Sequence, residues 1–169
     1  MTAMLNDQSL RVMEVSELLA READHIDRRE WKEWVDMYTP DAVFWMPAWR
    51  NEDETTQDPM QEISLIYLPD RGIEDRVFRF SSGDSYASTP LPTTSHCVGS
   101  VRVLADQGDT VTASAKAIVA TMDPRTGNIV RGVWYDYELV RVDGELKIKT
   151  KKVTFLERVI DGTVDVYNV

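Results

Sequence analysis

The chain has 169 residues, of which 43% are hydrophobic and 28% are charged, so its size and composition suit one globular domain spanning residues 1–169. Its net charge of −10 disfavours binding to nucleic acid or to anionic lipid. The longest apolar runs, such as residues 42–46, are far shorter than the roughly 18 residues of a membrane span. With one cysteine and no N-terminal export pattern, we expect a cytoplasmic protein.

The potential metal ligands also limit the chemistry of the chain. Its only imidazoles are His25 and His96, and its only thiol is Cys97. A Rieske iron–sulfur centre requires two cysteines and two histidines, so the chain cannot supply one, nor any four-cysteine cluster. The sequence also lacks a Gly-rich phosphate-binding loop. We therefore expect no cofactor and no metal site in this chain, and any associated redox chemistry must come from another protein.

The N-terminal part predicts two helices followed by a strand. Apolar residues at three- and four-residue steps predict a helix over residues 9–26, capped by Asp7 or Ser9. The same spacing predicts a short helix over 31–38, ended by Pro40. Alternation then changes to that of a strand over 41–47, which has apolar residues on both faces.

The middle of the chain predicts short elements joined by loops. Residues 49–58 are acidic without periodicity, and since the spacing of a calcium-binding loop is absent, they predict a solvated loop. A strand is expected over 63–68 and a charged helix over 73–80. Residues 81–92 are rich in Ser, Gly, Thr and Pro and predict a loop.

The C-terminal half predicts an antiparallel meander. Four strand-like runs, residues 96–104, 110–121, 129–142 and 145–158, are separated by turn sequences such as Asp143-Gly144. In the last run the apolar phase slips by one residue near 150–152, which predicts a β-bulge and strong curvature. The expected fold class is α+β: a curved, bulged, mainly antiparallel sheet wrapped like a cone around N-terminal helices.

Several segments in fixed order resemble one protein family. They are Phe-Trp-Met-Pro-Ala-Trp at 44–49, Asp-Pro at 58–59, Glu-Ile-Ser-Leu-Ile-Tyr at 62–67, Arg71, Glu-Asp-Arg-Val-Phe-Arg at 74–79 and Thr-Ser-His at 94–96. The chain resembles the small (beta) subunit of aromatic ring-hydroxylating dioxygenases, of the benzoate, toluate, halobenzoate and anthranilate type. The resemblance spans nearly the whole chain. It implies the cone-shaped, cystatin-like fold of nuclear transport factors, ketosteroid isomerases and scytalone dehydratases.

The resemblance also implies partners and a division of labour. In this family the large (alpha) subunit carries the Rieske [2Fe-2S] cluster, the mononuclear non-haem iron and the substrate pocket. Three large and three small subunits usually form a hexamer, which receives NADH-derived electrons from a reductase and sometimes a ferredoxin. The implied reaction is cis-dihydroxylation of an aromatic acid such as benzoate by O₂. The chain itself is then a non-catalytic structural subunit.

Residue types typical of protein interfaces supply the candidate docking residues. Trp, Tyr and Arg combine large buried area with directional polar contacts. The candidates are Trp45, Trp49, Tyr67, Arg71, Glu74, Asp75, Arg76 and Arg79. The alternative is that Trp45 belongs to the core and that the charged residues form local ion pairs.

The main alternative function is a stand-alone isomerase or dehydratase of the same fold, with His96 as its acid–base residue. Asp41, Tyr38 and Asp136 are possible partners. A structural histidine is the competing interpretation, and a ligand-binding or adaptor module is a third possible function. We further interpret Cys97 as a small buried residue, and Lys147, Lys149, Lys151 and Lys152 as a solvated strand face.

Overall fold

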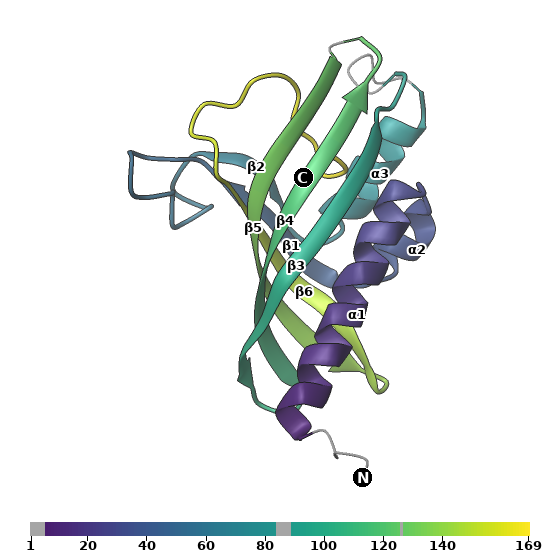
Figure 1. Cartoon of the computed structure of the whole chain (residues 1–169), viewed down its shortest axis with the longest axis vertical. Helices are drawn as coiled ribbons and strands as arrows, with labels where there is room; N and C mark the ends of the chain where they lie inside the picture. The colour runs from purple at the N-terminus through teal and green to yellow at the C-terminus, as the bar shows by residue number, and fades with distance from the viewer. Residues whose placement is uncertain (1–5, 84–88, 126) are drawn as a thin grey trace.

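A computed structural model describes residues 6–83, 89–125 and 127–169. Within them, one six-stranded sheet curves around three helices (Figure 1). In chain order the elements are α1 (Asp7–Asp27), α2 (Trp31–Val35), β1 (Tyr38–Pro47), β2 (Ser64–Leu68), α3 (Gly72–Ser81), β3 (Thr93–Asp106), β4 (Thr110–Asp123), β5 (Gly127–Val142) and β6 (Glu145–Phe155). The fold is therefore α+β, as predicted.

The sheet has the strand order β2-β1-β6-β5-β4-β3. Strands β3 to β6 form the predicted meander, and its last hairpin turns at Asp143 and Gly144, which both have positive φ angles, 51° and 89°. An Asp-Gly pair suits such a turn because glycine adopts positive φ without strain. Strand β1 pairs in parallel with β6 and antiparallel with β2.

A β-bulge interrupts β6 close to the predicted position. Leu139 of β5 pairs with Ile148, and the preceding Glu138 pairs with Thr150, so Lys149 is the extra residue. The buried apolar side chains of β6 are even-numbered before Lys149, at Leu146 and Ile148, and odd-numbered after it, at Val153 and Phe155. The bulge therefore keeps the apolar side chains on the inner face while bending the strand.

The helices and the inner face of the sheet form one hydrophobic core. Helix α1 lies along the inner face beside β3 (Figure 1) and buries its apolar stripe there. Trp34 of α2 is fully buried, and Ile73, Val77 and Phe80 place α3 against the same core. No helix covers the outer face, as Figure 1 shows for the described residues.

Some local predictions were wrong. Asn6, rather than Asp7 or Ser9, caps α1, because its side chain accepts a hydrogen bond from Ser9 N. Helix α2 ends at Val35, and β1 already begins at Tyr38. Pro40 thus lies inside β1, where the pairing with β6 is irregular between Tyr38 and Val43 because proline has no N–H to donate.

Other boundaries shifted by a few residues. Strands β3, β4 and β5 run beyond the predicted ends, whereas β6 stops at Phe155 instead of residue 158. Cys97 is exposed, contrary to the prediction, because β3 directs it outward while the neighbouring His96 faces the core. Part of the loop predicted over 81–92, residues 84–88, lies outside the described residues.

Candidate functional site

The interior of the cone holds a buried ion pair. Lys151 Nζ lies 2.8 Å from Glu22 Oε1, and both side chains are almost completely buried. The same carboxylate accepts hydrogen bonds from the hydroxyls of Tyr38 and Tyr137, at 2.5 and 2.8 Å. Lys151 also lies 4.4 Å from the ring centroid of Tyr135. Lys151 is thus a core residue, and its assignment to a solvated strand face was wrong.

Electrostatics favours the ionised form of the Glu22 carboxyl. Burial alone would raise the pKa of the Glu22 carboxyl, but the Lys151 ammonium and the hydrogen bonds from Tyr38 and Tyr137 outweigh it, and the pKa lies below its ordinary value. Burial, reinforced by Glu22, raises the pKa of Tyr38 and Tyr137 well above 10. The tyrosines therefore stay protonated as donors to a permanent carboxylate.

His96 lies near the C-terminal end of α1, paired with a different carboxylate from those considered in the sequence. Its Nδ1 donates to Asp27 Oδ1 at 2.6 Å, and its backbone N–H donates to Asp27 Oδ2 at 2.8 Å. Its Nε2 faces the Val169 carbonyl oxygen at 3.3 Å. Burial alone would raise the pKa of the Asp27 carboxyl, but the hydrogen bonds from His96 outweigh burial, so the pKa lies below its ordinary value. Both ring nitrogens therefore face oxygen atoms of other residues.

This geometry favours a structural role for His96. The side chain is 2% exposed, and it lies outside the pocket of about 320 Å³ lined by Arg71 and Glu74. The expected partners lie elsewhere: Tyr38 bonds Glu22, Asp41 pairs with Lys149 at the surface, and Asp136 is exposed. The stand-alone enzyme is therefore the less supported reading.

Aromatic candidates gather on the outer face of the sheet. Tyr67 of β2, Trp45 of β1 and Lys152 of β6 are direct neighbours in register. Trp45 is partly exposed, donates from Nε1 to Ser64 Oγ at 2.8 Å, and has the Lys152 ammonium 4.8 Å from its ring centroid. Trp45 thus stands outside the core, available to a partner.

Trp49 plays a more internal part. Its Nε1 donates to the carbonyl oxygen of Phe155 at 3.0 Å, and the Arg158 guanidinium lies 5.8 Å from its ring centroid. The ring therefore ties the loop after β1 to the end of β6, while remaining partly exposed.

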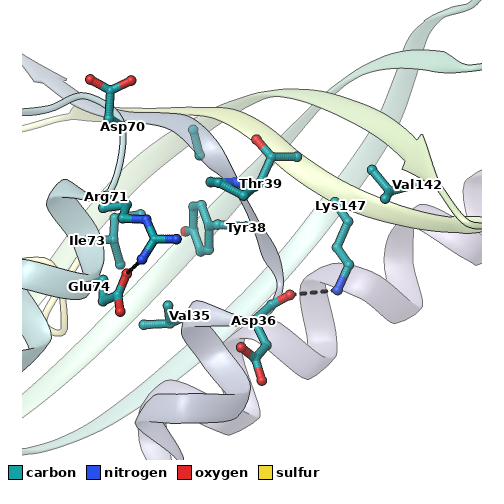
Figure 2. Close-up of a pocket in the computed structure, with 12 residues that line it drawn as sticks. Val35, Asp36, Tyr38, Thr39, Asp70, Arg71, Ile73, Glu74, Val142 and Lys147 are labelled. Atoms are coloured by element: carbon teal, nitrogen blue, oxygen red, sulfur yellow. Dashed lines mark hydrogen bonds and ion pairs between the residues drawn. The ribbon is translucent and has the colours of Figure 1, made fainter.

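The charged candidates lie on or just before α3. Arg71, which precedes the helix, and Glu74 form an ion pair at 3.3 Å and line a pocket of about 320 Å³. Figure 2 shows them across this pocket from Asp36 and Lys147. Lys147 Nζ donates a hydrogen bond to the backbone carbonyl oxygen of Asp36 at 2.6 Å.

Arg76 differs from its neighbours on α3. It forms a two-pronged ion pair with Asp165, with N···O distances of 2.8 and 3.0 Å, so it holds the C-terminal segment. Asp75 and Arg79 are exposed.

The sequence reasoning missed an apolar patch on the outer face. Ile118 of β4 pairs with Gly132 of β5, and Ala120 pairs with Val130. The patch consists of Ile118, Met122, Val130, Trp134 and Leu156, each between 43% and 60% exposed. The signal was present, because Ile118, Met122, Val130 and Trp134 are large apolar residues in the outward phase of their strands. Trp134 lies on the strand next to Lys152, two residues before Asp136, the register partner of Lys152, so the patch lies diagonally beside the Tyr67–Trp45 row.

Among residues 6–83, 89–125 and 127–169, no cluster of three or more His, Cys, Asp or Glu side chains could hold a metal ion. The helices described by the structure include none that is both long and apolar enough to cross a membrane.

The fold and its filled interior define a class: a cone-shaped α+β protein with partly exposed aromatic residues on the outside of its sheet. The family model described as "Ring hydroxylating beta subunit" matches residues 21–162. The chain therefore belongs to the family of ring-hydroxylating beta subunits.

Individual relatives agree over nearly the whole chain. The 2-halobenzoate 1,2-dioxygenase small subunit of Burkholderia cepacia is 38% identical, with 93% of this chain and 95% of the relative covered. The toluate 1,2-dioxygenase subunit beta of Pseudomonas putida is also 38% identical, with 92% and 96% covered. The crystal structure of the beta subunit of benzoate 1,2-dioxygenase from Burkholderia mallei superposes with a TM-score of 0.73 at 28% identity, covering 99% of this chain and 100% of that one.

Proposed function

We propose that the chain is the non-catalytic small subunit of the oxygenase component of an aromatic ring-hydroxylating dioxygenase. The observation that carries the proposal is its similarity to small subunits over more than nine-tenths of its length. The relatives are named for dioxygenation of benzoate-type acids, so an aromatic acid such as benzoate is the proposed substrate class of the complex. The reaction would add both atoms of O₂ to the ring.

The catalytic groups belong, in this proposal, to a larger alpha subunit that carries a Rieske cluster and a mononuclear iron. The ligand chemistry of this chain supports that division. Two histidines and one cysteine cannot complete a Rieske site, and His96 and Cys97 point to opposite faces of β3. The proposed assembly contains three large and three small subunits, and it receives electrons from a reductase, with or without a ferredoxin, in the cytoplasm.

The outer face of the sheet is the proposed docking surface for the large subunit. It offers the row Tyr67, Trp45 and Lys152 together with the adjoining apolar patch. Partly exposed aromatic residues beside cations are typical anchors of interfaces, because the ring loses water while the charge stays paired. The exposed charges of α3 and the residue before it, namely Arg71, Glu74, Asp75 and Arg79, would contribute at a rim.

Co-expression with the large subunit from the same operon tests the assignment. We expect a metal-free small chain when it is expressed alone, and an iron-containing assembly of roughly 200 kDa when both chains are present, as a symmetric ring of paired subunits would produce. Size-exclusion chromatography with light scattering and iron analysis measures both. Stoichiometric iron in the lone chain, or failure to join the large subunit, would contradict the proposal.

Two substitutions test the docking surface. Trp134→Ala and Trp45→Ala each remove an exposed ring while leaving the inner face of the sheet intact. For an interface anchor we expect the dissociation constant of the complex to rise about 30-fold, which corresponds to about 2 kcal/mol. Leu10→Ala, on the exposed side of α1, is the matched control and should change nothing. Parent-like affinity of both tryptophan variants, with unchanged circular dichroism, would place the interface elsewhere.

A further inference from the structure

The last residues of the chain fill one end of the cone. Figure 1 shows the chain passing behind β4 towards α3 after it leaves β6. The C-terminal segment, residues 164–169, is almost entirely inaccessible from Asp165 onward, and Val166 and Val169 are completely buried. Burial to this degree requires specific contacts.

Three contacts seat the C-terminal segment. The ion pair between Arg76 and Asp165 anchors its beginning. The Tyr167 ring packs edge-to-face against Phe80, with 5.1 Å between centroids. The Val169 carbonyl oxygen faces His96 Nε2 at 3.3 Å. The segment thus packs the Tyr167 ring against Phe80 and places an oxygen atom near His96 Nε2, which are contacts that a bound small molecule could also make.

The surroundings of the segment contain a polar atom that it does not satisfy. Thr121 Oγ1 is buried without a hydrogen-bond partner among the described residues, and Thr121 lines a cavity of about 10 Å³ together with Tyr167 and Asn168. An unpaired hydroxyl is costly in a packed interior.

We propose that the C-terminal segment occupies a ligand-binding site of the cone as a built-in ligand. The site takes a planar aromatic ring that carries a carbonyl or carboxylate oxygen: the ring replaces Tyr167 against Phe80, and the oxygen replaces the Val169 carbonyl at His96. A free ligand competes with a tethered segment of high effective concentration. The intact chain therefore binds such molecules weakly, and weakening the segment uncovers the site.

The first test empties the ring position in the full-length chain. Tyr167→Ala removes the ring from Phe80, and acetophenone, phenol and toluene serve as probes. We expect acetophenone and phenol to raise the midpoint of thermal unfolding of this variant by about 2–4 °C and to leave the parent unchanged. Phe78→Ala, on the exposed side of the same helix as Phe80, is the control and should respond to none of them. No response of Tyr167→Ala to any probe would overturn the proposal.

The second test loosens the segment without changing the proposed site. Arg76→Ala should lower the dissociation constant for acetophenone at least about 10-fold relative to the parent, as titration calorimetry would measure. The charge-exchanged pair Arg76→Asp with Asp165→Arg should restore the weak binding of the parent. In the Arg76→Ala background, His96→Gln should abolish the preference for acetophenone over toluene. Equal binding of the two probes while His96 is still present would refute its role. If Arg76→Ala does not fold, the response of Tyr167→Ala decides alone.

Discussion

The buried ion pair makes a sharp prediction about stability. Lys151→Met replaces the ammonium by an apolar side chain of similar length and leaves Glu22 in the core. The carboxylate then keeps the hydroxyl donors of Tyr38 and Tyr137 but loses its only contacting cation among the described residues. Because an unpaired charge cannot be hydrated there, the folded state should lose far more stability than it does when a surface lysine is removed.

The magnitude follows from the geometry. Two unit charges 2.8 Å apart attract each other by about 6 kcal/mol at an effective dielectric constant of about 20. The variant no longer has to remove the lysine ammonium from water when it folds, and this saving offsets part of the lost attraction. Loss of one partner of a buried pair costs about 3–5 kcal/mol in practice. With a urea dependence of about 2 kcal/mol per molar, the unfolding midpoint should fall by about 2 M.

Urea unfolding followed by tryptophan fluorescence provides the assay, with Lys149→Met as the matched control. Lys149 lies on the same strand but pairs with Asp41 at the surface, so its removal should cost less than about 1 kcal/mol. The double variant Glu22→Gln with Lys151→Met should recover much of the loss, since no charge then remains buried.

The effect of pH has a defined sign. In the parent, the pKa of Glu22 is lower in the folded state, so the pair stabilises the fold above the ordinary pKa of glutamate, near 4.5, and this contribution fades as the pH falls through the folded value. Without Lys151, burial instead raises that pKa. The difference in stability between parent and variant should therefore be larger at pH 7 than at pH 4.5. A loss below 1 kcal/mol at pH 7, or one equal to that of Lys149→Met, would refute the reasoning.

Three further predictions concern other parts of the fold. Gly72→Ala should lower the free energy of unfolding in urea by about 1–3 kcal/mol, because the new Cβ would lie 2.7 Å from the Cβ of Leu68, which is fixed to the backbone. Gly132→Ala should cost less, since its Cβ would lie nearest to the movable end of the exposed Leu156 side chain. Asp27→Asn should destabilise the chain at pH 7 and progressively less as the pH falls below 4, because the lowered pKa of Asp27 contributes stability only above that range; parallel pH profiles of variant and parent would contradict this. Arg131→Met should make residues 157–163 sensitive to limited proteolysis, because the buried guanidinium donates to the Asp161 carbonyl at 2.6 Å; parent-like resistance would show that other contacts hold this segment.

Patterns of period and turn chemistry predicted most of the fold. Alternation in residues 129–142 separated the buried from the exposed side chains of β5, and the slip of phase in β6 predicted a bulge found at Lys149. These predictions succeeded because one face of the sheet is buried, which forces the apolar residues into register. The end of α2 and the start of β1 were missed because a proline is compatible both with the end of a helix and with an irregular strand. Pro40 was assigned to the first and occupies the second.

The interior site was not predictable in the same way. Glu22 and Lys151 are 129 positions apart; Lys151 was assigned to a solvated strand face, and Glu22 was not singled out. His96 was considered as an acid–base residue or a structural histidine, but its partner Asp27 comes from the end of α1, which local spacing cannot reveal. Long-range pairs of this kind depend on topology, which periodicity does not encode.

The parallel pairing of β1 with β6 bears on how the molecule reaches its native state during synthesis. The first strand leaves the ribosome early, but its central neighbour in the sheet is the last strand to be made. Until then, Phe44 and Met46 have no completed core to enter, and β1 is exposed along one edge. Distant pairings of this kind slow folding and prolong the exposure of apolar strands. The β1–β2 pair therefore cannot join the meander of β3 to β5 until β6 has been made.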